Sequence, residues 1–110
     1  MENRFVPIVD NQELEQLIAR SHDAPVLLFK HSSTCPISAT AYKEMTKLER
    51  DIALVVVQRA RDISREIEAR TGVRHESPQA LVLRNGEAVW TASHWNVTAD
   101  AVERALNEHE

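Results

Sequence analysis

The chain has 110 residues, 43% of them apolar and 27% charged, with a formal net charge of -4. This length and composition are typical of one folded domain, and we expect residues 1–110 to form a single, monomeric domain. The acidic balance and the scattered basic residues argue against a nucleic-acid partner. No apolar run approaches the ~18 residues that span a bilayer, and the first residues lack the apolar core of a signal peptide. We therefore expect a cytoplasmic protein without a membrane partner.

The first half of the chain begins with an extended run, a helical pattern and a second extended run. Residues 5–9 form the first run, in which Pro7 favours a sheet edge. Asp10 starts a capping-box-like pattern, and apolar residues at helical spacing predict an amphipathic helix over 11–22. Residues 25–29 are continuously apolar, which is typical of a central strand buried on both faces.

The middle of the chain repeats this alternation of helix and strand. Apolar residues recur at helical spacing from Ile37 to about Leu48, and residues 52–57 form another buried strand pattern rich in branched side chains. Asp62 is a candidate N-cap for the next helix, and Gly72 fits the C-terminal end of that helix.

The last third of the chain predicts a hairpin followed by a helix. Residues 80–83 and 87–93 form the two strands around the turn signal Asn85-Gly86, and Thr98 opens the last helix. The order β-α-β-α-β-α-β-β-α implies parallel pairing of the early strands with helices on both faces. We therefore expect an α/β, thioredoxin-like fold, with a central mixed sheet of four to five strands flanked by helices on both faces.

Cys35 is the only cysteine, so the chain cannot form an internal disulfide. It follows a buried strand by a short loop and opens a helix whose first turn contains Pro36, a residue favoured there because its missing N–H would be unpaired anyway. Free backbone N–H groups and the helix dipole stabilise a thiolate at such a position, so the pKa is expected below the ~8.5 of free cysteine. A small buried hydrophobe is the alternative for a lone cysteine, but this position favours a reactive thiol.

Two polar neighbours are candidates to support Cys35. Ser38 lies one helical turn later and offers a hydroxyl to the sulfur, although a solvated helix position is the alternative. It cannot act as a second thiol, so a mixed disulfide on Cys35 must be resolved by another molecule. His31 and Lys30 lie just upstream and are candidates to add positive charge, on opposite sides of the strand; a surface loop position is the alternative for His31.

A second candidate segment is "RHESPQALVL", residues 74–83, where Ser77-Pro78 stands directly before a strand. We expect this X-Pro bond to be cis, with its loop packed against Cys35 and its backbone available to a bound peptide or thiol. An ordinary proline at the start of a strand is the alternative. His75 is a candidate to approach the same site. The five histidines show no metal-ligand spacing, and we expect no metal site.

Three segments, "FKHSSTCPIS", "GVRHESPQ" and "ASHWNVT", together resemble the monothiol bacilliredoxin family of the thioredoxin-like superfamily, over about Asp10 to Leu106. The resemblance implies a thiol-disulfide oxidoreductase that removes bacillithiol from S-bacillithiolated client proteins, with bacillithiol as co-substrate and no tightly bound cofactor. Cys35 would be the nucleophile. The resemblance also implies supporting and binding residues: Pro36, Ser38, His31 and Thr34 around the thiol, and Ser77, Pro78 and His75 for the bound thiol or client.

The same resemblance shows where the chain departs from dithiol thioredoxins. Ser38 replaces the resolving cysteine, and Phe29 stands where thioredoxins have a buried aspartate that helps deprotonate that cysteine. Thr34 and Pro36 replace the usual flanking residues, so client recognition is expected to differ. Two alternatives stay open: a redox sensor or adaptor modified at Cys35 without client turnover, and an iron–sulfur carrier of the monothiol glutaredoxin type, which would need a dimer and external thiols.

Overall fold

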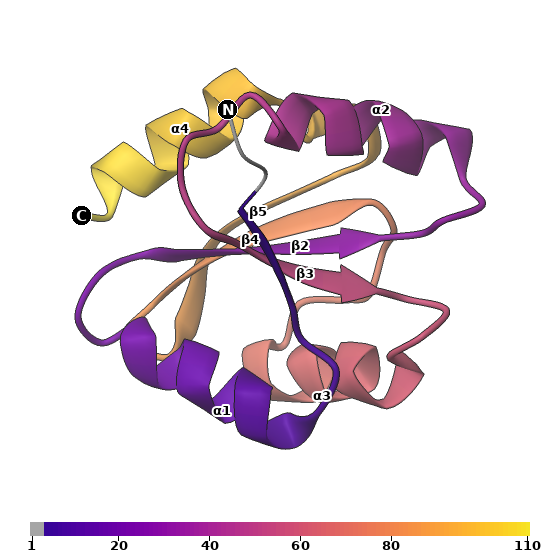
Figure 1. Cartoon of the computed structure of the whole chain (residues 1–110). Helices are drawn as coiled ribbons and strands as arrows, with labels where there is room; N and C mark the ends of the chain where they lie inside the picture. The colour runs from indigo at the N-terminus through magenta and orange to yellow at the C-terminus, as the bar shows by residue number, and fades with distance from the viewer. Residues whose placement is uncertain (1–3) are drawn as a thin grey trace.

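A mixed sheet of five strands organises residues 4–110, the part of the chain that the computed structural model describes (Figure 1). The strands are β1 (Phe5–Pro7), β2 (Val26–His31), β3 (Ile52–Val56), β4 (Gln79–Arg84) and β5 (Glu87–Ser93). The helices are α1 (Asn11–Arg20), α2 (Pro36–Met45), α3 (Arg61–Thr71) and α4 (Ala99–Glu108), with a short 3-10 helix, η1 (His94–Asn96), between β5 and α4. The predicted α/β class and the order of the elements are confirmed.

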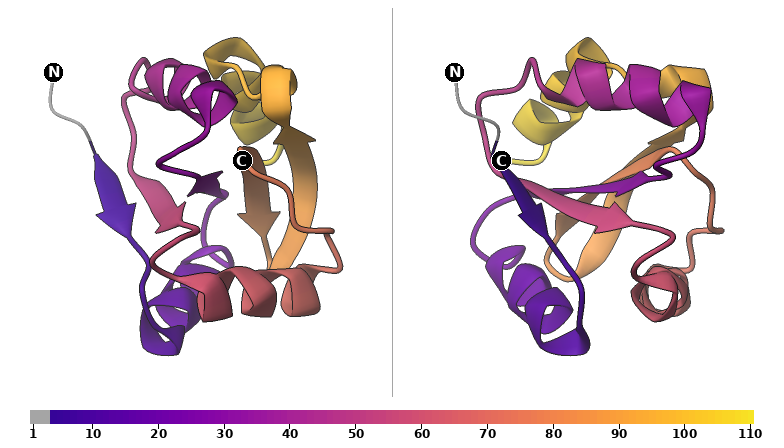
Figure 2. Two further views of the ribbon diagram at one scale, coloured as in Figure 1. Left: turned by 90° about the vertical axis from the view of Figure 1, so that its right-hand side faces the viewer. Right: turned by 45° about the vertical axis from the view of Figure 1, so that its right-hand side comes forward.

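The strand order places β2 at the centre of the sheet. The order is β1-β3-β2-β4-β5, with β1 and β2 parallel to β3, and β4 antiparallel to both β2 and β5. In this register Lys30 of β2 lies opposite Gln79 of β4. The C-terminal end of β2 and the start of β4 therefore lie at the same end of the sheet, and the loops beyond them lie on the same side of the molecule (Figures 1 and 2).

Helices cover both faces of the sheet, as predicted, with α2 and α4 on one face and α1 and α3 on the other (Figure 1). Side chains of β2 alternate between the two layers. Leu27 and Phe29 belong to the hydrophobic cluster that includes Met45 of α2 and Leu106 of α4, whereas Leu28 belongs to the cluster under α1 and α3. The continuous apolar pattern of β2 follows from this burial on both faces.

Local sequence signals explain most of the helix and turn boundaries. The Asp10 carboxylate accepts the Glu13 N–H at 2.8 Å at the start of α1, and the Thr98 hydroxyl accepts the Ala101 N–H at 3.2 Å at the start of α4. Gly72 ends α3 with a φ of 73°, in the left-handed region that glycine adopts without steric cost.

Several expected boundaries were wrong: β1 and α1 each end two residues early, at Pro7 and Arg20, and three others concern α3, α2 and β2. Ala60, not Asp62, is the N-cap of α3, and Asp62 lies in the first turn, where its carboxylate still complements the helix dipole. Helix α2 ends at Met45 because Leu48 N–H bonds to the Met45 carbonyl in a tighter turn. Strand β2 extends to His31, two residues beyond the expected end, so that it includes the charged Lys30.

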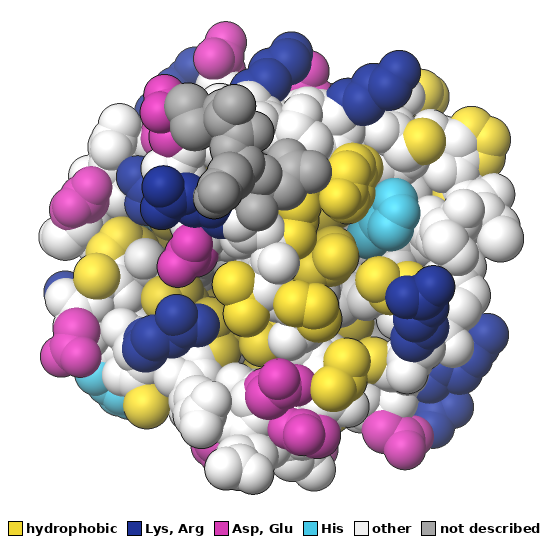
Figure 3. Space-filling view, viewed as in Figure 1, with side chains coloured by type: hydrophobic (Ala, Val, Ile, Leu, Met, Phe, Trp, Pro, Cys, Tyr) yellow, Lys and Arg dark blue, Asp and Glu magenta, His cyan; other side chains and the backbone are white. Residues whose placement is uncertain are grey.

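The two edges of the sheet differ in how they are formed. β5 is joined to β4 by the expected Asn85-Gly86 turn, in which both residues have positive φ, 57° and 79°. β1 is three residues long and contains Pro7, as expected for an edge strand. Hydrophobic side chains gather over the middle of the face that β1 crosses (Figure 3), and on this edge Val6 is 39% exposed. No helix among residues 4–110 is long and apolar enough to cross a membrane.

Candidate active site

Cys35 is held at the N-terminus of α2. It is the N-cap residue, with extended backbone angles (φ -101°, ψ 122°), and Pro36 occupies the first turn of the helix. Its N–H bonds to the Ser32 carbonyl at 3.4 Å, and its own carbonyl accepts the Ala39 N–H at 3.1 Å. The thiol is free and partly exposed. The strand-loop-helix placement expected from the sequence is therefore present, with the sulfur open to another molecule.

The surroundings of Cys35 lower the pKa of its thiol. The largest cause is the backbone N–H of Ser38, with smaller contributions from the Ile37 N–H and the Ser38 hydroxyl, while partial burial opposes them. These donors stabilise the negative charge of the thiolate and leave the neutral thiol without comparable interactions. Because the thiolate is the attacking species in disulfide exchange, the site favours a nucleophilic cysteine.

Ser38 is fully buried rather than solvated. The Ser32 N–H donates to its Oγ at 3.2 Å, which occupies the oxygen as an acceptor and leaves the hydroxyl proton free to point to the sulfur. Ser38 thus links the loop before Cys35 to the helix after it. At the position of a second thiol in a C-x-x-C, the chain has an oxygen that cannot be oxidised to a disulfide.

Gln58, which sequence reasoning missed, holds the loop that precedes Cys35. Its Nε2 donates to Ser32 Oγ at 2.7 Å and to Thr34 Oγ1 at 3.2 Å, and its Oε1 accepts the Ser33 N–H at 3.2 Å. Gln58 follows β3, whose C-terminal end lies beside that of β2 because the two strands are parallel. A polar residue directly after the neighbouring strand was the available signal. The exposed Thr34 is held in place by this side chain.

His31 lies at the end of β2 on the α2 side of the sheet. Its ring is 5.1 Å from the Tyr42 ring and 5.8 Å from the Phe29 ring, measured between centroids. Burial lowers the pKa of His31, against a smaller opposing effect of the Ser38 backbone. The ring is therefore neutral near pH 7, and His31 contributes an uncharged imidazole near the start of α2 rather than the positive charge considered from the sequence.

The Ser77–Pro78 peptide bond is cis, as expected from the sequence. Pro78 is buried, and its carbonyl accepts the His94 N–H at 2.9 Å, which connects this loop to η1. The Ser77 hydroxyl is buried without a hydrogen-bond partner. Because Lys30 pairs with Gln79, the Ser77-Pro78 loop and the Cys35 loop lie at the same end of the sheet.

His75 lies on the opposite face from α2. Its Nδ1 is 3.0 Å from Ser64 Oγ of α3 and 3.3 Å from Lys30 Nζ. The structure therefore separates His75 from His31, which were expected around one site. The binding role given to His75, Ser77 and Pro78 stays a prediction.

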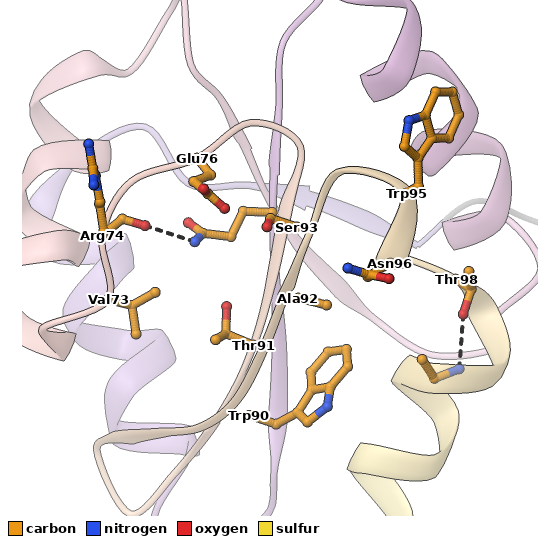
Figure 4. A pocket seen from close by; sticks show the side chains of 12 residues that line it. Val73, Arg74, Glu76, Trp90, Thr91, Ala92, Ser93, Trp95, Asn96 and Thr98 are labelled. Carbon is orange, nitrogen blue, oxygen red and sulfur yellow. Dashed lines mark hydrogen bonds between the residues drawn. The ribbon is translucent and has the colours of Figure 1, made fainter.

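A shallow groove of about 700 Å³ follows β5 beside these loops (Figure 4). Arg74 and Glu76 line it on one side of the strand, and Trp90 and Trp95 on the other. Trp95 is 66% exposed and belongs to η1, which contacts α2. The groove combines aromatic surface with charged donors and acceptors. Residues 4–110 contain no group of three or more His, Cys, Asp or Glu side chains arranged to hold a metal ion.

Comparison with solved structures gives the class of protein. A structure described as a candidate oxidoreductase with a thioredoxin fold shares 36% identity, covers 93% of each chain and superimposes with a TM-score of 0.86. Thioredoxin from Fasciola hepatica is 14% identical over 94% of this chain and 98% of its own, with a TM-score of 0.75, and mitochondrial thioredoxin 3 from Saccharomyces cerevisiae is 16% identical over 94% of each chain, with a TM-score of 0.72. The fold and the Cys35 site thus define a thioredoxin-fold protein of thiol redox type.

The family follows from a match over most of the chain. The model of the monothiol bacilliredoxin BrxC family matches residues 6–102. The chain belongs to this family, as the three sequence segments indicated.

Proposed function

We propose that this chain is a monothiol thiol-disulfide oxidoreductase that removes bacillithiol from S-bacillithiolated proteins, with Cys35 as the nucleophile. The observation that carries the proposal is the pairing of a stabilised thiolate at Cys35 with a buried hydroxyl at Ser38. Such a site attacks a mixed disulfide but cannot release itself by forming an internal one. Membership of the bacilliredoxin family supports bacillithiol as the exchanged group.

The proposed reaction has two balanced exchange steps. The Cys35 thiolate attacks the bacillithiol sulfur of the mixed disulfide, a new S–S bond forms between Cys35 and bacillithiol, and the client leaves as a thiolate. A second bacillithiol thiolate then attacks the adduct, restores the Cys35 thiolate and leaves as bacillithiol disulfide. Overall the client cysteine is reduced, and the one bacillithiol thiol that enters in the second step is oxidised to the disulfide level. The chain needs no bound cofactor for either step.

Recognition of bacillithiol requires donors for its carboxylates. Arg74 is exposed at the groove beside β5 and carries a guanidinium suited to bidentate contact with a carboxylate. The backbone of Ser77, at the edge of the sheet shared with the Cys35 loop, is proposed to pair with the bound thiol or client. A cytoplasmic location fits a chain that uses one free thiol, because a reducing compartment keeps it reduced.

Intact-mass measurement tests the proposal. A single-cysteine client carrying a bacillithiol adduct is mixed with the reduced protein, and both masses are followed with time. We expect the adduct to leave the client and appear on Cys35, then to leave Cys35 when free bacillithiol is added. The Cys35→Ala variant should leave the client unchanged. Retention of the adduct by the client while Cys35 stays free would refute the proposal.

Two variants separate the steps and the alternatives. Ser38→Cys introduces a second thiol, and we expect an internal disulfide to replace the bacillithiol adduct without added bacillithiol. Ser38→Ala is the matched control that changes the same side chain without adding a thiol. If Cys35 accepts bacillithiol from its disulfide but no client is turned over, the protein is a sensor. Colour after anaerobic reconstitution with iron and sulfide would favour the iron–sulfur carrier.

A further inference from the structure

Lys30 is buried in the central strand β2, near the end of the sheet where the Cys35 loop begins. It has no exposed surface, and it is the one charged residue among the buried side chains of residues 4–110. It lies in β2, five positions before Cys35. Its side chain points to the face of the sheet that α3 covers, whereas Cys35 opens α2 on the opposite face. Burying a charge is unfavourable unless it is well paired, so this lysine needs an explanation that packing does not give.

The ammonium of Lys30 contacts the imidazole of His75. Nζ is 3.3 Å from Nδ1, and Ser64 Oγ is 3.0 Å from the same nitrogen. An ammonium group can only donate, so Nδ1 is the acceptor and the imidazole is neutral, with its proton on Nε2. Glu68 of α3 accepts the His75 backbone N–H at 3.0 Å and also attracts the charge on Lys30.

His75 is part of the segment that carries Ser77-Pro78. The Gln79 amide, directly opposite Lys30 in the sheet, donates from Nε2 to the Arg74 carbonyl at 2.9 Å. Residues 74–78 are therefore fixed to β4 at one point and to β2 through the side-chain contact between Lys30 and His75. The strand that leads to Cys35 and the loop that carries Pro78 are joined by this buried contact.

We propose that Lys30 is a positioning residue for thiol exchange: by donating to neutral His75 it holds the loop of residues 74–78 in place beside the Cys35 loop. This contact is lost when His75 gains a proton, and it is weakened when Lys30 loses its charge. The proposal rests on the proposed function, because it concerns the same reaction. It assigns the pair a role that neither side chain has by touching the sulfur.

Charged groups surround Lys30 and His75 and influence the pH range over which their hydrogen bond persists. From α3, Arg61, Arg65 and Glu68 line a surface hollow of about 160 Å³ next to His75, which gives the imidazole access to protons from solvent. From the loop, Arg74 and Glu76 flank it, and β4 adds only the uncharged Gln79.

Both members of the pair have lowered pKa values. Burial is the main cause of the lowered pKa of His75, followed by the charge of Lys30, while Glu68 and Glu76 oppose it. Burial lowers the pKa of Lys30 to about 8, with Glu68 opposing. The charged lysine and the neutral histidine therefore coexist from below the usual histidine value of 6.5 up to about pH 8.

The pH profile of bacillithiol transfer tests the proposal. Transfer from client to Cys35 is measured from about pH 5.5 to about pH 9 and divided by the rate of Cys35 alkylation by iodoacetamide, which removes the effect of thiolate formation. We expect the corrected wild-type rate to fall at both ends of the range. Lys30→Met should lower it roughly tenfold near neutral pH, the size of a charge-assisted hydrogen bond, and flatten the profile. An unchanged profile in Lys30→Met would overturn the proposal.

His75→Gln is the matched variant, because its amide oxygen still accepts from Lys30 but does not titrate. We expect its pH profile to keep the fall above pH 8 and to lose the fall on the acidic side, whatever its rate near neutral pH. Retention of the acidic fall in this variant would assign that titration to another group and contradict the role of His75.

Nitrogen NMR of the His75 ring gives a readout that needs no activity. We expect the Nε2–H tautomer, and amide shifts of Ser77 and Gln79 that titrate together with His75 in the wild type but not in Lys30→Met. Coupled shifts without any transfer from the client would mean that the proposed function fails, although the Lys30–His75 contact still positions the loop of residues 74–78. Transfer without coupled shifts would retain the function and refute the positioning role.

Discussion

Replacing Lys30 with methionine should stabilise the protein near neutral pH. Burial lowers the pKa of Lys30 from 10.5 to about 8, so the folded state disfavours the charged form by about 3 kcal/mol, at ~1.4 kcal/mol per pKa unit. Methionine has a similar length and no charge. It loses the charge-assisted hydrogen bond to His75, worth about 1.5 kcal/mol, so the net gain in unfolding free energy is about 2 kcal/mol.

This gain should depend on pH in a defined direction. Between about pH 8 and 10.5 the unfolded chain still binds a proton at Lys30 that the folded chain has released. Wild-type stability therefore rises with pH through this window relative to the variant, because the unfolded state binds more protons. The advantage of Lys30→Met should be full below pH 8 and should disappear by about pH 10.5.

Urea denaturation at a series of pH values measures the effect. For a small protein with a slope of roughly 2 kcal/mol per molar urea, the midpoint near pH 7 should rise by about 1 M in Lys30→Met. Lys43→Met, on the exposed side of α2, controls for the loss of one positive charge. A constant difference between wild type and Lys30→Met at all pH values, or a less stable variant at pH 7, would refute the assignment of a buried charge.

Three further outcomes follow from contacts in the site and the core. Ser38→Ala should raise the pKa of Cys35 only part of the way to its ordinary value, because the backbone donors remain. The pH dependence of iodoacetamide alkylation measures this pKa. An unchanged midpoint would contradict the role of the hydroxyl. Gln58→Ala removes three hydrogen bonds to the loop before Cys35. It should speed hydrogen exchange of the Ser33 amide roughly tenfold and lower the unfolding free energy by at most about 1 kcal/mol. Unaltered exchange at Ser33 would show that the loop keeps its conformation without Gln58. Leu106→Ala empties a fully buried site of α4 and should lower the unfolding free energy by about 3 kcal/mol in urea denaturation, and a loss below about 1 kcal/mol would mean that the core closes over the cavity.

Features that depend on neighbouring residues could be predicted from the sequence, both in the fold and in the site. Pro36 after Cys35 indicated the start of α2, Gly72 the end of α3, and Asn85-Gly86 the hairpin turn, because each of these residues has a backbone preference that neighbouring contacts do not override. The apolar run of β2 indicated a strand buried on both faces. These features depend on residues within a few positions of each other.

The contacts that join distant segments were not predictable from patterns. The expected strand ended with the apolar run at residue 29, and nothing in that pattern indicated that the lysine after it would be buried. Its burial depends on His75, 45 positions later, whose approach requires the antiparallel pairing of β2 with β4. Gln58 likewise reaches the loop before Cys35 only because β2 and β3 run in parallel.

The place of β4 in the sheet bears on how the chain acquires its structure during synthesis. β2 forms early in the chain, but its second neighbour in the sheet is β4, which begins at Gln79. Until that segment leaves the ribosome, one side of β2 has no strand partner and both apolar layers are incomplete. Pairing between such distant segments also slows folding, because a long loop must close before the contacts form. The nascent chain thus leaves one side of this largely apolar strand unpaired while residues 32–78 are synthesised, a period in which chaperone binding would protect it from aggregation.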